Sequence, residues 1–330
     1  MTTKTLRALV MQPGAIRLEP DELPAPAPDE VLLRTTKTLI SPGTERAIML
    51  NLPGLAVQYP KSVGYSHVGE IVQVGAQVRS LKIGDRVASK SRHASHALVN
   101  ERLCHQLAPD LDDERATFFQ LLATSLQALR KTRLELGEAT AVLGAGLVGQ
   151  LALQLARLAG AMPVVAIDNH GGRLKLAHEL GADHIVSDAD AAKDAIAASA
   201  LAEGFQVVVE ATGNPAALQT ACDIAAHGGR IALLGSSRGA TESFDFYKRV
   251  HKKGITLIGA HIDTAARLAS APGWWTLRDE QHTALKLLQN ERVAVAPLIS
   301  HRFHCGEIAA AYDLLAEWNL DALGMMIDWS

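Results

Sequence analysis

Short, almost continuous apolar runs mark the middle of the chain, at residues 140–143, 164–167 and 206–210. Runs of this kind are typical of strands that are buried on both faces of a parallel sheet. Between them, residues 147–158 and 173–180 carry apolar positions at helical spacing. Strands that alternate with helices in this way predict an α/β domain with a doubly wound parallel sheet.

The same alternation continues toward the C-terminus. Further strands are expected at residues 184–186, 230–234 and 255–258, and further helices at 191–202 and 215–226. Together with the three runs above, these make the six strands of a complete doubly wound sheet.

The first 110 residues have a different pattern, with short β-prone stretches separated by Pro and Gly. The expected strands are 6–11, 16–19, 31–38, 68–74 and 85–88. A helical pattern at 111–129 leads out of this β-rich part, and a helix is expected at 281–290. We predict one domain at 1–120, completed by a strand and a helix within 297–330, and a second domain at 121–296.

Composition narrows the class of protein. The chain has 330 residues, 48% of them hydrophobic and 20% charged, which is ordinary for a globular enzyme with two domains. A net charge of −3 without a basic block argues against nucleic acid as a partner. No apolar run approaches the ~20 residues that span a membrane, and residues 1–20 lack a signal-peptide pattern. Isolated Cys104, Cys222 and Cys305 suit a reducing compartment, so we expect a cytoplasmic enzyme with a small-molecule substrate.

A glycine-rich turn links the first central strand to its helix. Gly144 permits the turn, Gly146 lets the backbone approach a pyrophosphate, and Gly149 allows close packing of helix on strand. The helix N-terminus adds free N–H groups and partial positive charge. Asp168 follows the next strand, where an acid binds the adenosine ribose. The segment predicts dinucleotide binding, with NAD favoured over NADP, although nearby Arg173 could accommodate a 2′-phosphate.

A series of landmarks along the chain resembles the medium-chain dehydrogenase/reductase superfamily, which contains the zinc-type alcohol dehydrogenases. The landmarks are Gly64 with residues 68–72, Gly75, and residues 84–87, 144–149, 181–183 and 228–230. The resemblance covers nearly the whole chain. It implies a GroES-like β-rich catalytic domain, a Rossmann domain and a homodimer.

The resemblance also implies cofactor contacts at strand ends and in the glycine turn. These residues are Thr124, Leu147, Val148, Asn169, Ala211, Thr212, Gly235, Ser236, Gly259, Ala260 and His261. The last three follow the sixth strand, where the family contacts nicotinamide.

The chain departs from the family at the catalytic zinc. Pro42, Tyr65 and Gln120 stand where the resemblance implies the metal ligands, and Ser66 replaces a Glu. Pro and Gln are not ligands of such a site, and a neutral Tyr is a poor one. The four-cysteine lobe is missing too. The chain therefore resembles a zinc-independent branch, and residues 41–45 (Ser-Pro-Gly-Thr-Glu) are similar to those of bacteriochlorophyllide dehydrogenase and sugar or polyol dehydrogenases.

Without a metal, hydrogen-bond donors must polarise the carbonyl and a side chain must move the proton. Thr44 aligns with the family's proton relay, and Tyr65 is expected to point into the cleft, with His67 or Glu45 as the proton exit. The alternative is that Tyr65 and His67 only pack. Candidate substrate contacts are Ser41, Ser66, His93, His96, Gln120, Trp274 and Trp275. Two groups of potential metal ligands lie close together in the sequence, namely His93 with His96, and His301 with His304 and Cys305. Neither group is expected to bind metal.

These observations favour a zinc-independent, NAD-dependent dehydrogenase that interconverts a secondary alcohol and a ketone, with a sugar- or polyol-like substrate. One alternative is an NAD(P)H-dependent reductase of enones or quinones, against which the absent Asn-containing stretch counts. Another is a nucleotide-binding redox sensor without catalysis.

Overall fold

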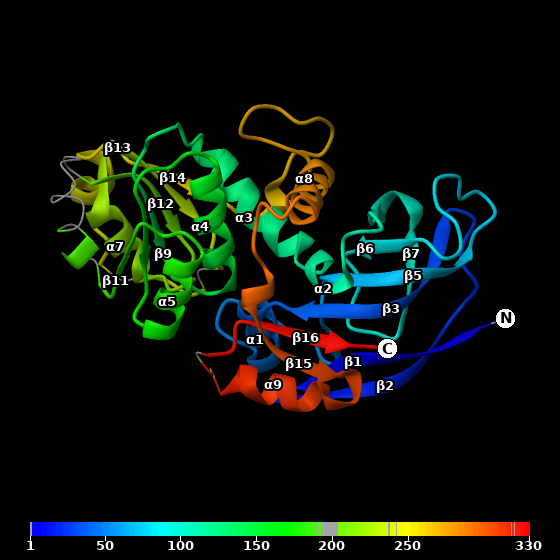
Figure 1. Ribbon diagram of the computed structural model, residues 1–330. Coiled ribbons are helices and arrows are strands. Elements are labelled where there is room, and N and C mark those ends of the chain that lie inside the picture. The colour runs from blue at the N-terminus through cyan, green and yellow to red at the C-terminus, as the bar shows by residue number, and fades with distance from the viewer. Residues whose placement is uncertain are drawn as a thin grey trace. The chain divides into compact units, whose positions relative to one another are not determined.

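The structure is a computed structural model that describes residues 2–188, 190–192, 194, 204–236, 238–241, 243–317, 319 and 321–330. It divides into two compact units (Figure 1). The first unit contains Met1–Gln120, Ala284–Glu291 and Val295–Ser330, and the second contains Leu121–Thr283 and Arg292–Ala294. The first unit is thus assembled from both ends of the chain.

The second unit is built on a parallel six-stranded sheet in the order β11-β10-β9-β12-β13-β14. In chain order the strands are β9 (Thr140–Leu143), β10 (Val164–Ile167), β11 (His184–Val186), β12 (Phe205–Glu210), β13 (Ala225–Leu233) and β14 (Thr256–Gly259). Val142 of β9 pairs with Ala166 on one side and Val209 on the other. This is the doubly wound arrangement that the apolar runs predict, a Rossmann fold.

Helices connect these strands, and a cluster of buried residues such as Leu143, Val165 and Ile231 fills the space beneath them. Helices α4 (Leu147–Leu158), α5 (Gly171–Glu179) and α7 (Ala217–Ile224) lie between these strands in the chain, whereas α3 (Phe119–Thr132) precedes the first of them. Helix α8 (Leu277–Gln289) follows the last strand, and its residues from Ala284 onward belong to the first unit, not to the second as predicted. The short helices η2 (Tyr247–His251) and η3 (Ile262–Thr264) lie on either side of β14 in the chain. The helix expected at 191–202 lies mostly outside the described residues.

The first unit contains two sheets. The smaller has the order β2-β1-β4, and the larger has the order β15-β16-β3-β5-β6-β8, with β7 also pairing β3. The strands are β1 (Thr3–Gln12), β2 (Ala15–Leu23), β3 (Glu30–Ile40), β4 (Lys61–Ser62), β5 (His67–Val74), β6 (Arg86–Ser89), β7 (His96–Asn100), β8 (His105–Gln106), β15 (Ile299–His304) and β16 (Gly324–Asp328). The helices and turns are α1 (Pro42–Leu50), η1 (Glu101–Leu103), α2 (Asp113–Ala116), η4 (Ala296–Leu298), η5 (Cys305–Glu307) and α9 (Ile308–Ala316). This β-rich unit confirms the GroES-like class.

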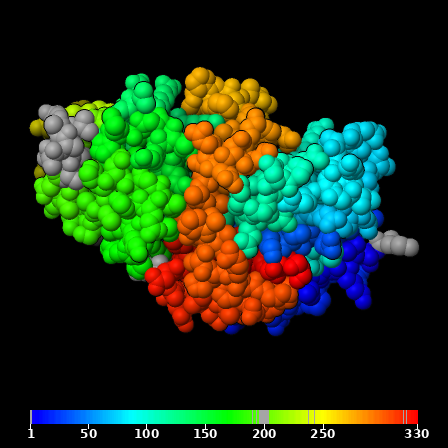
Figure 2. All heavy atoms as spheres, in the orientation of Figure 1, coloured from blue at the N-terminus to red at the C-terminus, as the bar shows by residue number. Residues whose placement is uncertain are grey.

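The C-terminal segment completes the first unit. β16 pairs antiparallel with β3, with Met325 opposite Ile40, and in Figure 2 the red C-terminal residues lie beside blue N-terminal ones. Met325, Ile40 and Tyr312 of α9 belong to one buried cluster. Early and late parts of the sequence therefore share one core.

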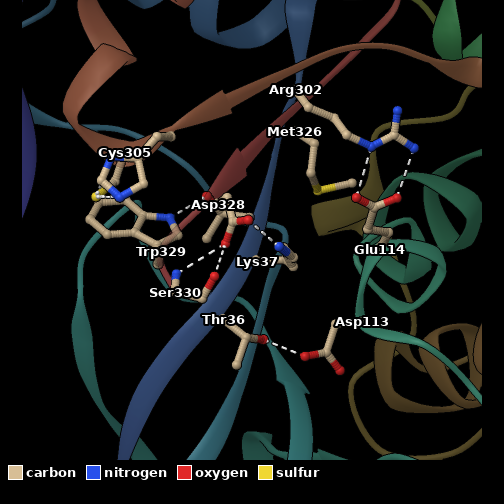
Figure 3. Close-up of polar contacts among 12 residues, drawn as sticks. Thr36, Lys37, Asp113, Glu114, Arg302, Cys305, Met326, Asp328, Trp329 and Ser330 are labelled. Carbon is tan, nitrogen blue, oxygen red and sulfur yellow. Dashed lines mark hydrogen bonds and ion pairs between the residues drawn. The ribbon is translucent and has the colours of Figure 1, made fainter.

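Charged contacts fix this returning segment at the surface (Figure 3). Arg302 of β15 donates two hydrogen bonds of 2.9 Å to the Glu114 carboxylate, and these lower the pKa of Glu114. Lys37 of β3 lies 2.5 Å from the Asp328 carboxylate. Partial burial acts to raise the pKa of Asp328, but hydrogen bonds from Lys37 and Ser330 outweigh it and lower the pKa to about 2.

Several features differ from the expected elements, and strands β4, β7 and β8 were not predicted. Helix α1 was not predicted, although Pro42 at its N1 position suits a helix start. The helical pattern at 111–129 is two helices, α2 and α3. Residues 297–330 contain two strands rather than one. Among the described residues, no helix is both long and apolar enough to cross a bilayer.

Candidate active site

A buried carboxylate organises the polar residues of the first unit. Glu45 lies in the first turn of α1 and its side chain is 1% exposed. Its Oε1 accepts the Ser41 backbone N–H at 2.8 Å, so the side chain reaches back to the residue that precedes the helix. Its Oε2 accepts the Tyr312 hydroxyl and lies 3.0 Å from His93 Nε2. Donors from three separate parts of the sequence therefore converge on one carboxylate.

The hydrogen bonds of His93 connect Glu45 to Thr38 and Trp329. Its Nδ1 lies 2.7 Å from Thr38 Oγ1, which accepts the Trp329 indole N–H at 2.9 Å. Both ring nitrogens of His93 therefore have partners, with Nε2 facing Glu45. Burial and the Glu45 charge raise the pKa of Tyr312 well above its usual value.

A pair of hydroxyl groups adjoins this carboxylate. The Tyr65 hydroxyl donates a hydrogen bond to Ser41 Oγ, and Ser41 is the N-cap residue of α1. Ser41 is buried, whereas Tyr65 is partly exposed. Thr44, also partly exposed, occupies the same first turn as Glu45. Ser66 Oγ is buried without a hydrogen-bond partner among the described residues. The arrangement offers hydroxyl donors to an oxygen atom at the surface of the unit.

Two histidines are placed differently from their expected roles. His67 is fully buried, with Nε2 2.9 Å from Thr35 Oγ1 and Nδ1 3.0 Å from Ser89 Oγ. Burial, with a smaller effect of His93, lowers the pKa of His67 to about 3. This geometry does not suit a proton exit. His93 is also fully buried with both nitrogens bonded, so it supports Glu45 and cannot contact a substrate directly.

The remaining substrate candidates are His96, Gln120, Trp274 and Trp275. The ring of His96 lies 3.2 Å from Ser95 Oγ, and Gln120 is buried at the start of α3. Trp274 and Trp275 belong to the second unit, where their rings lie beneath cations of α3. Lys131 Nζ is 4.7 Å from the Trp274 ring centre and the Arg130 guanidinium is 3.7 Å from that of Trp275.

The glycine turn of the second unit has the properties that a dinucleotide requires. Gly144 has φ of +98°, and a Cβ added at Gly149 would lie 1.9 Å from Gly144 O. At Gly146 the same atom would meet nothing within 4 Å. The first and third glycines are thus needed by the fold, while the second leaves open space before the α4 N-terminus. That space suits an approaching pyrophosphate.

Asp168 lies directly after β10 and supports this turn. Its Oδ2 accepts the Ala145 N–H at 2.7 Å and its Oδ1 accepts the His170 N–H at 2.8 Å. The other cofactor candidates that the sequence places at strand ends lie there in the structure, with Ala211 and Thr212 after β12, Gly235 and Ser236 after β13, and Gly259, Ala260 and His261 at the end of β14. Glu210, which was not predicted, accepts the Thr212 N–H at 2.7 Å.

The residues at the implied zinc position are a poor donor set. Pro42 has no donor atom and begins α1, and Tyr65 is bonded to Ser41. Zinc in proteins prefers Cys, His and carboxylate ligands. No group of three or more His, Cys, Asp or Glu side chains in the described part of the chain is placed to hold a metal ion.

Two family models match the chain. Residues 27–112 match the alcohol dehydrogenase GroES-like domain, and residues 148–271 match the zinc-binding dehydrogenase model. L-threonine 3-dehydrogenase of Pseudoalteromonas atlantica is 28% identical, with 94% of this chain and 96% of that protein covered. Sorbitol dehydrogenase of Ovis aries is 26% identical, with 94% and 93% covered.

Solved structures share the fold. Galactitol-1-phosphate dehydrogenase of Escherichia coli has a TM-score of 0.84 at 22% identity, with 98% of this chain and 99% of that one covered. A dehydrogenase of Sinorhizobium meliloti 1021 bound to NADP has a TM-score of 0.82 at 20% identity, and an alcohol dehydrogenase of E. coli CFT073 complexed with NADH has 0.84 at 18%. For both, 99% of each chain is covered.

The chain belongs to the medium-chain dehydrogenase/reductase superfamily, in its zinc-type alcohol dehydrogenase-like part. It is accordingly an oxidoreductase of the alcohol dehydrogenase type.

Proposed function

We propose that this protein is a metal-free, NAD-dependent dehydrogenase of secondary alcohols, with a polyol- or sugar-like substrate. The observation that carries the proposal is the replacement of the zinc ligands by a Tyr65–Ser41 hydroxyl pair backed by Glu45. Threonine 3-dehydrogenase and sorbitol dehydrogenase among the relatives support a hydroxylated substrate.

The hydroxyl pair replaces the Lewis acid in this proposal. When bound, the oxidised nicotinamide accepts the hydride from the alcohol carbon. Ser41 Oγ accepts a hydrogen bond from Tyr65, so the Ser41 proton is available to the substrate oxygen. Hydrogen-bond donors at this point stabilise the alkoxide as it forms and donate to the ketone in reverse. In ketone reduction Ser41 gives its proton to the substrate oxygen, Tyr65 replaces that proton, and water reprotonates the partly exposed Tyr65. In alcohol oxidation these hydrogen bonds reverse, so that the alcohol proton passes to Ser41, the Ser41 proton to Tyr65 and the Tyr65 proton to water.

Asp168 supports the choice of NAD. Hydrogen bonds from Ala145 and His170 hold its carboxylate at the end of β10. A negative charge there would repel the 2′-phosphate of NADP and can bind the ribose hydroxyls of NAD.

An absorbance assay at the nicotinamide band tests the proposal, using chelator-treated protein. NAD or NADP is offered with polyols, sugars and simple secondary alcohols, and NADH with enones and quinones. We expect chelator-resistant turnover of alcohols with NAD, and a loss of about 10²-fold in kcat for Tyr65→Phe. Turnover confined to enones or quinones would instead identify a double-bond or quinone reductase. Cofactor binding without any turnover would identify a sensor.

A further inference from the structure

The Glu45 carboxylate is held by more groups than a surface ion pair would need. Tyr312 and His93 are both fully buried, and both point at its Oε2. Thr38 is buried too, and it connects His93 to Trp329. Four residues therefore fix one side chain that the proposed substrate does not reach.

The fixed carboxylate acts on the hydroxyl pair through the backbone. Glu45 Oε1 accepts the Ser41 N–H at 2.8 Å, and the Glu45 N–H donates to Ser41 O at 3.0 Å. Both the backbone N–H and the backbone C=O of Ser41 are thus hydrogen-bonded to Glu45. Its Oγ is the acceptor for Tyr65, so the position of Glu45 determines where the hydroxyl pair lies.

We propose that Tyr312, His93 and Thr38 are positioning residues that hold Glu45 so that the Ser41–Tyr65 pair meets the substrate oxygen. This inference rests on the proposed function. It assigns a role in the reaction to helix α9, whose Tyr312 lies 267 residues beyond the glutamate that it contacts. It also explains how a carboxylate can be buried here, because three hydrogen-bond donors can stabilise a buried charge.

The test variant is Tyr312→Phe, which removes one hydroxyl and keeps the aromatic ring in the core. Tyr59→Phe is the matched control. The Tyr59 hydroxyl donates to Ile48 O at 2.7 Å and the ring packs against the same hydrophobic cluster, but it does not contact Glu45. A second test variant is Thr38→Val, which keeps nearly the shape of the native side chain. It removes the hydroxyl that connects His93 to Trp329 by hydrogen bonds.

Pre-steady-state stopped-flow measurement of enzyme-bound NADH formation, with NAD and an accepted alcohol in excess over enzyme, separates positioning from folding. Misfolded enzyme lowers the amplitude of the first turnover, whereas misplaced hydroxyls lower its rate constant. We expect the rate constant to fall about tenfold in Tyr312→Phe, the effect of losing one hydrogen bond to a charged group. It should also fall in Thr38→Val, because His93 loses the partner of its Nδ1, and stay unchanged in Tyr59→Phe.

The outcomes are distinguishable. A wild-type rate constant in Tyr312→Phe, while Tyr65→Phe is slow, would overturn the positioning role and leave the proposed function standing. A fast Tyr65→Phe would overturn the hydroxyl-pair mechanism itself. A loss of amplitude alone in Tyr312→Phe would show that Tyr312 serves only the fold. If Tyr312→Phe does not fold, Thr38→Val decides by the same criteria.

Discussion

At the scale of single residues, histidines in this chain serve the protein interior more than the substrate. His67 bonds to Thr35 and Ser89, and His93 bonds to Thr38 and Glu45. Sequence position alone put both near the cleft. Burial with hydrogen-bonded ring nitrogens makes them structural supports of β5 and of Glu45, and for His67 this has a measurable effect on stability.

Acid should destabilise the protein through His67. Its pKa is about 3 in the fold and about 6.5 when unfolded, so folding favours the neutral ring. The stabilisation is complete above pH 6.5 and is lost as the pH falls toward 3, by up to roughly 4–5 kcal/mol. The free energy of unfolding, measured by urea titration at a series of pH values, should fall less steeply in His67→Gln than in wild type. Exposed His184→Gln serves as the control and should follow wild type. Parallel curves for all three proteins would contradict the assignment.

At the scale of elements, the glycine turn separates a requirement of the fold from a requirement of the cofactor. Gly149 has no room for a Cβ, whereas Gly146 faces open space. The two positions lie three residues apart on the same strand–helix connection (149 − 146) but should respond to substitution in opposite ways.

Gly149→Ala should lower the free energy of unfolding by about 1–3 kcal/mol or more, because its Cβ would collide with Gly144 O. Gly146→Ala should keep wild-type stability yet weaken NADH binding about tenfold or more, since its methyl group would occupy the pyrophosphate space. Thermal melts and a fluorescence titration measure both effects. Gly43 in the first unit also faces open space, so Gly43→Ala is the control and should change neither the stability nor the affinity for NADH. Tight NADH binding by Gly146→Ala would place the pyrophosphate elsewhere.

The strands and helices also show how much of the fold could be predicted from the sequence. The Rossmann strands were found because buried parallel strands are continuous apolar runs, and β9, β10 and β11 have the expected bounds. Helix α1 was missed because Pro42 and Gly43 have low helix propensity, which the Ser41 and Glu45 contacts offset. Glu45 and Tyr65 were found as candidates through the family resemblance. Tyr312 and Trp329 were not, because their contacts join residues far apart in the sequence and no local pattern records such pairings.

At the scale of the whole molecule, the first unit depends on both ends of the chain. Its buried cluster combines Val10, Ile40 and Met49 with Ile308, Met325 and Ile327. Each fully buried side chain of this size contributes about 1.5–3 kcal/mol, so removal of residues 295–330 should cost more than the entire stability of a domain.

Separate expression tests this dependence. Residues 1–120 alone should remain unfolded, and the same residues joined by a linker to 284–330 should fold, as measured by circular dichroism and by chemical-shift dispersion. Residues 121–294 contain all of the second unit and should fold and bind NADH alone. A folded 1–120 fragment would show that the C-terminal segment only covers a core that is already complete.

The split first unit also sets an order of events during synthesis. Roughly 200 residues separate Gln120 from β16, so at about 5–20 residues per second the ribosome needs on the order of 10–40 s to cover that interval. The second unit can fold within that time, while the early strands wait for α9 and β16 with apolar faces uncovered. Tyr312 and Trp329 emerge after the whole second unit, so a nascent chain can hold nucleotide well before Glu45 has its full set of partners. Chaperone binding during translation should therefore concentrate on the first 120 residues.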